Sequence, residues 1–357
     1  MSSSFFSSDS SDDVLSAYGW DEAYENAFTA HRSDGLTPGR VARVDRGHAT
    51  VVTADGWVRA AWSTAAEPPC TGDWAAVRLG ERPELVALLP RRTAIVRSSA
   101  SRTSHAQVLA ANVDTVVLAV SLATSAPAGR IERMVALAWE SGAVPVIVLT
   151  KADASERPVA VVRDEVAALA PGVETLAVSS VTGEGLDILA AILTGTIVLL
   201  GPSGAGKSTL GNALLGDDLL ATGDVRAVDG KGRHTTVHRE LIRLPDGGVL
   251  IDTPGLRAVG VHDGESGIQQ VFAEIEELAA DCRFSDCAHE SEPGCAVLAA
   301  IADGTLTQRR LDSYRKLLRE AAWAASRQDA RLRAERENQW KAITRHQRAI
   351  YKFRDKP

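Results

Sequence analysis

The sequence predicts a multidomain protein with a small N-terminal β-barrel, a central α/β domain and a helical C-terminal part that carries a compact cysteine cluster. Five short β-type runs follow Gly39 without helical periodicity, as in small barrels. From Asp114 to Gly201, apolar β-branched runs alternate with helical segments, which indicates βαβ units around a parallel sheet. Three of the four cysteines lie between Cys282 and Cys295.

Composition and charge fit this division. A chain of 357 residues, 45% of them hydrophobic and 24% charged, is long enough for several folded domains. The net charge of -7 argues against a nucleic-acid partner. However, residues 307–357 carry 15 Lys/Arg against 6 Asp/Glu, which leaves 24 Lys/Arg and 40 Asp/Glu for residues 1–306. The chain is therefore an acidic body with a basic tail.

The first 36 residues are predicted to form a disordered Ser/Asp-rich tail and a short helix over 14–30. The start has no basic region followed by an apolar core, so it is not a secretory signal. The longest apolar stretch, 188–200, is too short to span a bilayer. Clustered cysteines suit a reducing compartment. We expect a cytoplasmic protein with no membrane segment.

Residues 37–105 are assigned to the barrel. Its five β-type runs begin at residues 39, 48, 57, 73 and 84, and Ala54-Asp55-Gly56 provides a hairpin turn between two of them. The pattern favours an OB-like barrel, and an SH3-like barrel fits nearly as well. Residues 93–106 are polar and Ser-rich and are predicted to be a linker. A folded spacer with no ligand is the alternative to a binding role for the barrel, because fold alone does not give function.

Residues 106–265 are assigned to the α/β domain, where a phosphate-binding loop follows a predicted strand and begins a helix. Its glycines allow backbone N–H groups to surround phosphates, Lys207 reaches the β and γ oxygens, and the Ser208 hydroxyl binds magnesium. Asp252 and Gly255, in Asp-Thr-Pro-Gly after another strand, are typical of a switch that senses the γ-phosphate. The loop residues are Gly201, Pro202, Ser203, Gly204, Ala205, Gly206, Lys207, Ser208 and Thr209.

The base of the bound nucleotide is predicted from four residues at the end of another strand, Thr150, Lys151, Ala152 and Asp153. An Asp carboxylate accepts hydrogen bonds from N1–H and the 2-amino group of guanine, whereas adenine has neither donor. Lys151 can lie over the base plane. Ser179 and Ser180, at the end of the next strand, stand where a loop commonly supports the guanine carbonyl. Because both loops follow neighbouring strands of one sheet, guanine is favoured.

Hydrolysis of such a nucleotide needs a positioned water, a metal and charge stabilisation. Leu256 stands where Ras-like proteins carry the Gln that orients the water, so intrinsic turnover should be slow. In the segment between the phosphate loop and Asp252, His234 is the candidate for orienting the water, and Thr235 or Thr236 for completing the magnesium shell. Arg233 is a second candidate, as a charge stabiliser. The alternative for His234 is a surface-loop histidine without a catalytic role.

Residues 266–357 are assigned to a zinc-binding, basic helical domain, in which a helix rich in Glu and Ala near 267–280 precedes the cysteines. Cys282, Cys287, His289 and Cys295 supply three thiolates and one imidazole, which complete a tetrahedral shell of the structural kind. Glu290 and Glu292 are less favoured ligands, since the softer set is already complete.

Cations recur beyond the cysteines along a helical pattern, interleaved with Trp323, Trp340 and Tyr351, which favours structured RNA as a partner. A solvated helical face is the alternative. These cations are Arg309, Arg310, Arg315, Lys316, Arg319, Arg327, Arg331, Arg333, Arg336, Lys341, Arg345, Arg348 and Lys352.

The base-reading loops precede the phosphate loop, whereas in most GTPases they follow it. Together with the barrel and the cysteine cluster, this order resembles the RsgA (YjeQ) family of circularly permuted GTPases. Thr150 stands where many GTPases carry Asn, and the first 35 residues lie mostly outside the resemblance. The motifs that carry it are TPGRV, QVLAANVDTV, LTKAD, TGEGL, GPSGAGKST, GRHTT, DTPG and CRFSDCAHESEPGCAV.

The resemblance implies a GTP hydrolase that is slow alone and stimulated by the small ribosomal subunit, acts during late maturation of that subunit and leaves after hydrolysis. It implies GTP/GDP, magnesium and one zinc ion as cofactors, the small subunit and rRNA as partners, and a monomer, and it favours a catalytic role for His234. One alternative is a non-catalytic RNA-binding module with GTP as a structural ligand, which Leu256 keeps open. A zinc-dependent DNA-binding regulator is a weaker one, because no finger-helix pattern surrounds the cysteines.

Overall fold

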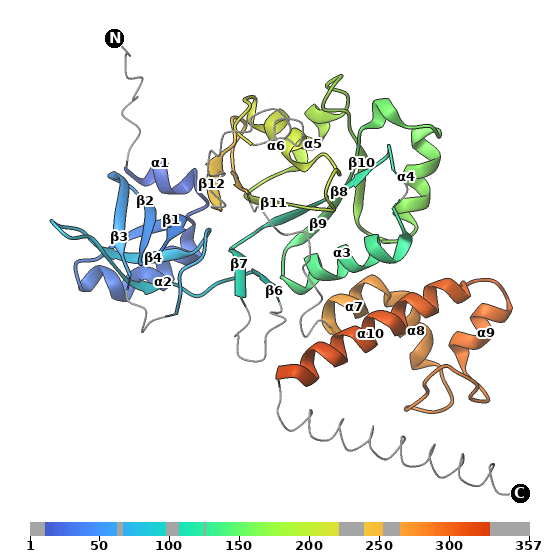
Figure 1. Cartoon of the computed structure of the whole chain (residues 1–357). Helices are drawn as coiled ribbons and strands as arrows, with labels where there is room; N and C mark the ends of the chain where they lie inside the picture. The colour runs from blue at the N-terminus through green and yellow to red at the C-terminus, as the bar shows by residue number, and fades with distance from the viewer. Residues whose placement is uncertain are drawn as a thin grey trace, which may run out of the picture. The chain divides into compact units, whose positions relative to one another are not determined.

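The computed structural model describes residues 11–62, 67–97, 107–124, 126–220, 239–252 and 265–328. Its described residues divide into two compact units, 11–252 and 265–328, each of which we describe by itself (Figure 1). The predicted residues that lie outside the described ones are Arg233, His234, Thr235, Thr236, Gly255, Leu256, Trp340, Tyr351 and the cations from Arg331 onward.

The first unit begins with two helices, α1 (Ser11–Ser16) and α2 (Glu22–Ser33), where the sequence predicted one. The chain turns between them because the Asp21 carboxylate accepts a hydrogen bond from the Tyr24 N–H at 3.0 Å and caps α2. Tyr24 and Phe28, one turn apart, are buried. The ring of Trp20 packs on the buried Trp74 of the barrel, 4.8 Å between ring centres.

A closed barrel follows, with strand order β1-β2-β3-β5-β4. All pairs are antiparallel except β3 with β5, an arrangement of the OB type that confirms the predicted barrel. The hairpin turn predicted at Ala54-Asp55-Gly56 joins β2 and β3. Alternating small and branched apolar residues fill the interior. The strands are β1 (Thr37–Asp45), β2 (His48–Thr53), β3 (Gly56–Ala61), β4 (Trp74–Arg78) and β5 (Glu84–Leu88).

The predicted linker 93–106 was partly wrong. β6 (Ala94–Arg97) pairs antiparallel with β7 (Gln107–Ala111) as a two-stranded ribbon. Ala94-Ile95-Val96 is a short β-branched run, and Ile95 becomes buried only when β7 supplies a partner. The polar segment 98–106 lies outside the described residues.

The α/β domain contains a six-stranded sheet of order β10-β9-β8-β11-β13-β12, parallel except for the edge strand β12. β8 and β11 are buried along their whole length, as expected for strands covered on both faces. The strands are β8 (Thr115–Ser121), β9 (Val144–Thr150), β10 (Glu174–Ala177), β11 (Thr196–Leu200), β12 (Glu240–Arg243) and β13 (Val249–Asp252). The helices are α3 (Ala128–Glu140), α4 (Val159–Ala167), α5 (Leu186–Ile192), α6 (Lys207–Leu215) and the 3-10 turn η1 (Ala152–Ala154).

The second unit is helical. The single helix predicted near 267–280 was wrong, because the chain breaks at Phe272 into α7 (Glu265–Val271) and α8 (Ala273–Ala280). The fully buried Phe272 ring lies under the guanidinium of Arg310, 4.2 Å from its centre. Two further helices are α9 (Ala296–Ala302) and α10 (Gln308–Gln328). Among the described residues, no helix combines the length and apolar character needed to cross a membrane.

The barrel meets the α/β domain at Gly72. Its φ of +94° is left-handed, and a Cβ at this position would lie 2.1 Å from the carbonyl oxygen of Ala111. Backbone contacts continue on both sides, since the Ala111 N–H donates to the Thr71 carbonyl at 3.0 Å. Only a glycine permits this approach of two backbones.

We expect Gly72→Ala to lower the free energy of unfolding by about 3 kcal/mol or more, because the new methyl group must displace the Ala111 carbonyl. Gly35→Ala is the matched control: Gly35 also has a left-handed φ, +69°, but nothing lies within 4 Å of the place that its new methyl group would take. The control should lose only about 1–2 kcal/mol. Denaturant unfolding checks both variants, and equal losses would contradict the close approach.

Candidate functional site

The predicted nucleotide loops meet at one edge of the sheet. β9, β10, β11 and β13 run parallel, so the segments that follow them leave from the same edge. Thr150 ends β9, Ser179 and Ser180 follow β10, and Gly201 follows β11. The structure therefore brings together residues that the sequence separates by about fifty positions.

The phosphate loop joins β11 to α6. Gly206 has a left-handed φ of +79° and directly precedes Lys207, the first residue of α6. The Lys207 ammonium donates to the carbonyl oxygens of Gly201 and Pro202, both at 2.8 Å, and so lies against the loop. Ser208 and Thr209 occupy the first turn of the helix, where backbone N–H groups bind anions. The geometry fits the predicted phosphate site.

Thr150 ties the base-reading loop to the phosphate loop. Its buried hydroxyl donates to the Ala205 carbonyl at 2.8 Å. Gly206 lies alongside, with Thr150 Oγ1 3.5 Å and Lys151 Cε 3.8 Å from where a Cβ would stand. Thr150 thus makes the inter-loop contact although it departs from the Asn of many GTPases.

Asp153 is oriented by Ser179. The Ser179 hydroxyl donates to the Asp153 carboxylate at 2.5 Å and accepts the N–H groups of Val181 at 3.3 Å and Thr182 at 3.1 Å. Ser179 is fully buried, whereas Asp153 is exposed. Ser179 therefore positions the residue predicted to read the base, while Asp153 keeps its second carboxylate oxygen for a ligand.

Ser180 and Thr209 line a cavity of about 410 Å³ between the loop after β10 and α6. Asn212, which the sequence analysis did not single out, shapes its wall: its amide accepts the Leu220 N–H at 2.7 Å and donates to the Leu220 carbonyl at 3.0 Å. A polar residue on the buried face of α6 was the available signal. The other lining residues are Ala213, Gly216, Asp217 and Asp218.

Asp252 is the last residue of β13, which pairs with the phosphate-loop strand β11. Burial raises the pKa of its carboxyl above the usual value, and the charge of Glu240, its partner on β12, adds to the effect. A cation close to Asp252 would relieve both penalties. Asp252 thus ends the strand next to that of the phosphate loop, where the sequence predicted the switch.

The four predicted zinc ligands converge. Their ligand atoms, from Cys282, Cys287, His289 and Cys295, all lie within 4.8 Å of one another. The Sγ atoms of Cys282 and Cys295 are 3.8 Å apart, and His289 Nδ1 lies 3.6 Å and 3.4 Å from them. A tetrahedron with Zn–S bonds of about 2.3 Å and a Zn–N bond of about 2.0 Å has S–S edges of about 3.8 Å and S–N edges of about 3.5 Å. The donor set therefore fits zinc.

Contacts around the cluster hold the ligands in place. The Cys295 sulfur accepts the Leu298 N–H at 3.4 Å and caps α9. The Glu292 carboxylate accepts the N–H groups of Ala288, Glu290 and Ser291, and backbone hydrogen bonds lower its pKa to about 2. Glu292 thus organises the loop, in agreement with its exclusion from the predicted ligand set.

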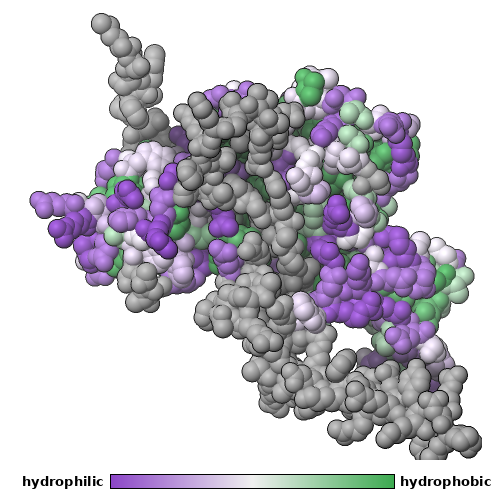
Figure 2. All heavy atoms as spheres, in the orientation of Figure 1, coloured by the Kyte–Doolittle hydropathy of each residue, from purple (hydrophilic) through white to green (hydrophobic). Residues whose placement is uncertain are grey.

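The predicted basic surface divides into two groups on α10. Arg310 is buried and donates to Glu274 and to the Val271 carbonyl, each at 2.6 Å, while Arg315 donates to the Ala288 and His289 carbonyls. These two cations hold the unit together. Arg309, Lys316 and Arg319 are exposed, and their spacing of seven and three residues places them on one face. Figure 2 shows hydrophilic residues along this helix.

Comparisons with known proteins agree with this geometry. A family model described as RsgA GTPase matches residues 88–262. A protein of Streptomyces coelicolor, named small ribosomal subunit biogenesis GTPase RsgA, is 58% identical, with 94% of each chain covered. A protein of the same name from Streptomyces avermitilis is 58% identical over 93% of this chain and 92% of its own length.

Two solved structures share the fold. YjeQ from Thermotoga maritima is 24% identical, with a TM-score of 0.60 over 80% of this chain and 98% of its own. YloQ, described as a circularly permuted GTPase, is 23% identical, with a TM-score of 0.58 over 80% of this chain and 95% of its own. The predicted family resemblance and permuted fold are confirmed.

We expect Thr150→Val to weaken GTP binding about fivefold, since loss of one buried hydrogen bond of about 1 kcal/mol releases the base-reading loop from Ala205. Thr150→Ser keeps the hydroxyl and is the matched control. Titration of a fluorescent GTP analogue measures both dissociation constants. Equal affinity of Thr150→Val and the native protein would show that the contact does not order the site.

Purified protein is expected to carry one zinc ion per chain, and Cys287→Ser should lose it and unfold the second unit at lower temperature, because the metal holds a segment with a small core. Elemental analysis and thermal unfolding measure the two effects. Cys70→Ser is the control: burial raises the pKa of the Cys70 thiol to about 12, and this cysteine lies in the first unit. A zinc content unchanged in Cys287→Ser would refute the ligand set.

Proposed function

The chain belongs to the RsgA GTPase family, and on this basis we propose that it is a GTPase that binds the small ribosomal subunit and hydrolyses GTP during its late maturation. The relatives of 58% identity are named for small ribosomal subunit biogenesis, and both align over more than nine-tenths of this chain. The observation that carries the proposal is the joining of the Thr150–Asp153 loop to the phosphate loop at one sheet edge.

Guanine is selected by Asp153. Its carboxylate accepts N1–H and the 2-amino group of the base, and Ser179 fixes its orientation before the nucleotide arrives. Lys151 lies over the base plane, and Ser180 supports the base from the following loop. The nucleotide pair is therefore GTP and GDP.

Hydrolysis proceeds without a covalent intermediate. A water attacks the γ-phosphorus, the bond to the β-γ bridging oxygen breaks, and GDP and phosphate leave. Lys207 stabilises the charge on the β and γ oxygens. Ser208, Asp252 and Thr235 or Thr236 would hold a magnesium ion, which would neutralise charge on the phosphate oxygens. His234 orients the water. With Leu256 in place of Gln, turnover is slow until the small subunit binds.

The subunit is bound through rRNA. The exposed cations Arg309, Lys316 and Arg319 lie on one face of a helix that the zinc loop braces, and such a face neutralises phosphates. GTP and GDP forms bind the subunit with different affinity, so hydrolysis leads to release. The protein acts as a monomer in the cytoplasm, where the subunit matures.

Asp153→Asn is expected to weaken GTP binding roughly a hundredfold, since two charge-assisted hydrogen bonds are lost or reversed. The same variant should gain affinity for xanthosine triphosphate, whose C2 carbonyl accepts the new amide N–H. Asp164→Asn, an exposed position on α4, is the control. Competition titrations with both nucleotides measure the switch, and loss of both affinities would contradict direct base reading.

Phosphate release at saturating small or large subunits tests the activity itself. We expect stimulation by small subunits alone, and in His234→Ala a roughly hundredfold loss of stimulated turnover with GTP affinity unchanged. His48→Ala, in the barrel, is the control. Absence of stimulation in the native protein would favour an RNA-binding module that holds GTP as a structural ligand.

A further inference from the structure

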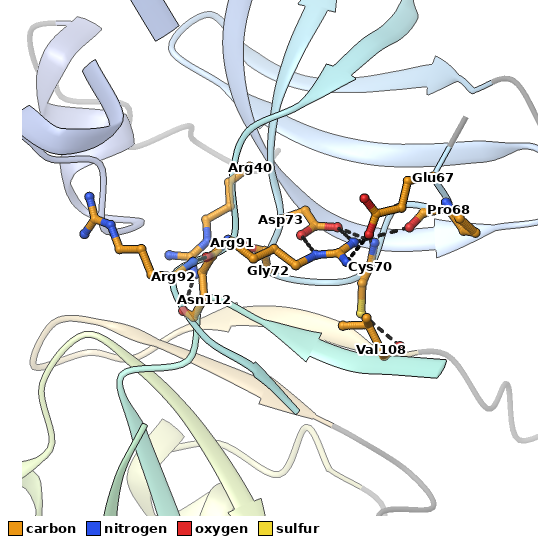
Figure 3. A network of polar contacts seen from close by, with 10 residues as sticks. All are labelled: Arg40, Glu67, Pro68, Cys70, Gly72, Asp73, Arg91, Arg92, Val108 and Asn112. Atoms are coloured by element: carbon orange, nitrogen blue, oxygen red, sulfur yellow. Dashed lines mark hydrogen bonds and ion pairs between the residues drawn. The ribbon is translucent and has the colours of Figure 1, made fainter. Parts of the chain in front are cut away.

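Arg40 is a fully buried cation at the centre of the first unit. Only 1% of its surface is exposed, and its guanidinium lies over the ring of Trp74, 5.1 Å from the ring centre. It donates to four acceptors, none of which is a carboxylate: the carbonyls of Tyr18, Gly72 and Asn112, and the hydroxyl of Thr196. Figure 3 shows Arg40 beside Gly72 and Asn112.

These acceptors come from three parts of the chain. Tyr18 lies in the turn between α1 and α2, and Gly72 lies in the barrel loop before β4. Asn112 and Thr196 belong to the α/β domain, with Nη2–oxygen distances of 3.1 Å and 2.7 Å. One planar guanidinium therefore fixes the helices, the barrel and the sheet in a single geometry, which a point charge cannot do.

Other contacts between the barrel loop 70–73 and the α/β domain surround Arg40, and we call this set of contacts the joint. Arg91 forms a bidentate ion pair with the buried Asp73, at 2.6 Å and 2.8 Å, and Asn112 donates to the Gly72 carbonyl at 3.0 Å (Figure 3). These contacts rigidify the barrel loop and the segment after β7. Arg40 alone among the residues drawn in Figure 3 also reaches β11 through a hydrogen bond.

Two of the strands that the barrel contacts, β11 and β12, adjoin segments of the proposed nucleotide site. Thr196 begins β11, whose other end is the phosphate loop. The Thr71 hydroxyl of the barrel donates to the carbonyl of Arg239 at 3.3 Å, and Arg239 directly precedes β12. The candidate switch residues His234, Thr235 and Thr236 lie just before Arg239 in the sequence.

We propose that Arg40 is a positioning residue for stimulated GTP hydrolysis. It holds the barrel rigidly against the α/β domain, so that a displacement of the barrel when the small subunit binds also moves β11, the strand before the phosphate loop, and β12, the strand after the switch segment. This inference rests on the proposed function, in which the small subunit stimulates turnover. Arg40 touches neither the nucleotide loops nor the cavity between Ser180 and Thr209, so basal hydrolysis does not depend on it.

Two variants test this role of Arg40, one by changing its side chain and the other by removing one of its acceptors. Arg40→Lys keeps the charge but loses the planar fork, and Thr196→Val removes only the acceptor on β11. Thr196→Ser keeps that hydroxyl and is the matched control. We expect basal turnover and GTP affinity within about twofold of the native protein in all three. Stimulation by small subunits should fall roughly tenfold in Arg40→Lys, about threefold in Thr196→Val, and stay unchanged in Thr196→Ser.

Hydrogen exchange locates the change. In Arg40→Lys and Thr196→Val, amides of 70–73 and 107–112 should exchange faster while β2 and β3 keep native protection. If Arg40→Lys loses protection against exchange throughout the barrel, this variant unfolds the barrel, and the stimulation measured for Thr196→Val alone then tests the proposal. Unchanged stimulation with a loosened joint, or basal and stimulated rates that fall by the same factor, would overturn the proposal. Native protein without stimulation would instead refute the proposed function.

Discussion

The nucleotide site depends on one constraint: the carboxyl ends of parallel strands share an edge of the sheet. β8, β9, β10, β11 and β13 all run in one direction, so the segments after them meet whatever their order along the chain. A circular permutation moves the chain ends but leaves this edge unchanged. The base-reading loop can therefore precede the phosphate loop in sequence and still lie against it, as the hydrogen bond from Thr150 to Ala205 shows.

At that edge, precision comes from residues whose side chains form hydrogen bonds to other parts of the protein. Ser179 orients Asp153, Thr150 holds the phosphate loop, and Asn212 fixes the cavity wall through Leu220. Such preorganised contacts lower the ordering cost when a ligand binds. The joint around Arg40 extends the same principle from the site to the barrel, because it connects the start of β11 to three other segments.

The second unit is stabilised differently, since its described part is short and exposes much of its surface. The convergence of three cysteines and one histidine supplies a ligand set that fits a closed metal site, which would take the place of a large core. Arg310 then attaches α10 to α7 and α8 through the Val271 carbonyl and Glu274. Arg315 attaches α10 to the loop that carries Cys287 and His289, through the Ala288 carbonyl. The cations of α10 thus differ in their surroundings: Arg310 and Arg315 hold the fold, whereas Arg309, Lys316 and Arg319 are exposed.

By itself the sequence determined the barrel, the parallel sheet, the glycine-rich loop between β11 and α6, the close group of three cysteines and one histidine, and the family, because each is a local pattern of residue types at characteristic spacing. It failed where local propensity competes with distant partners: the break at Phe272, the strand Ala94–Arg97 inside the predicted linker, and the structural use of Arg310. Only the tertiary structure decided that Ser179 serves Asp153, that Thr150 performs the inter-loop contact, and that Arg40 joins two domains. Each of these depends on hydrogen bonds between residues far apart in sequence, and residue type and spacing carry no record of which distant partner a buried polar group will meet.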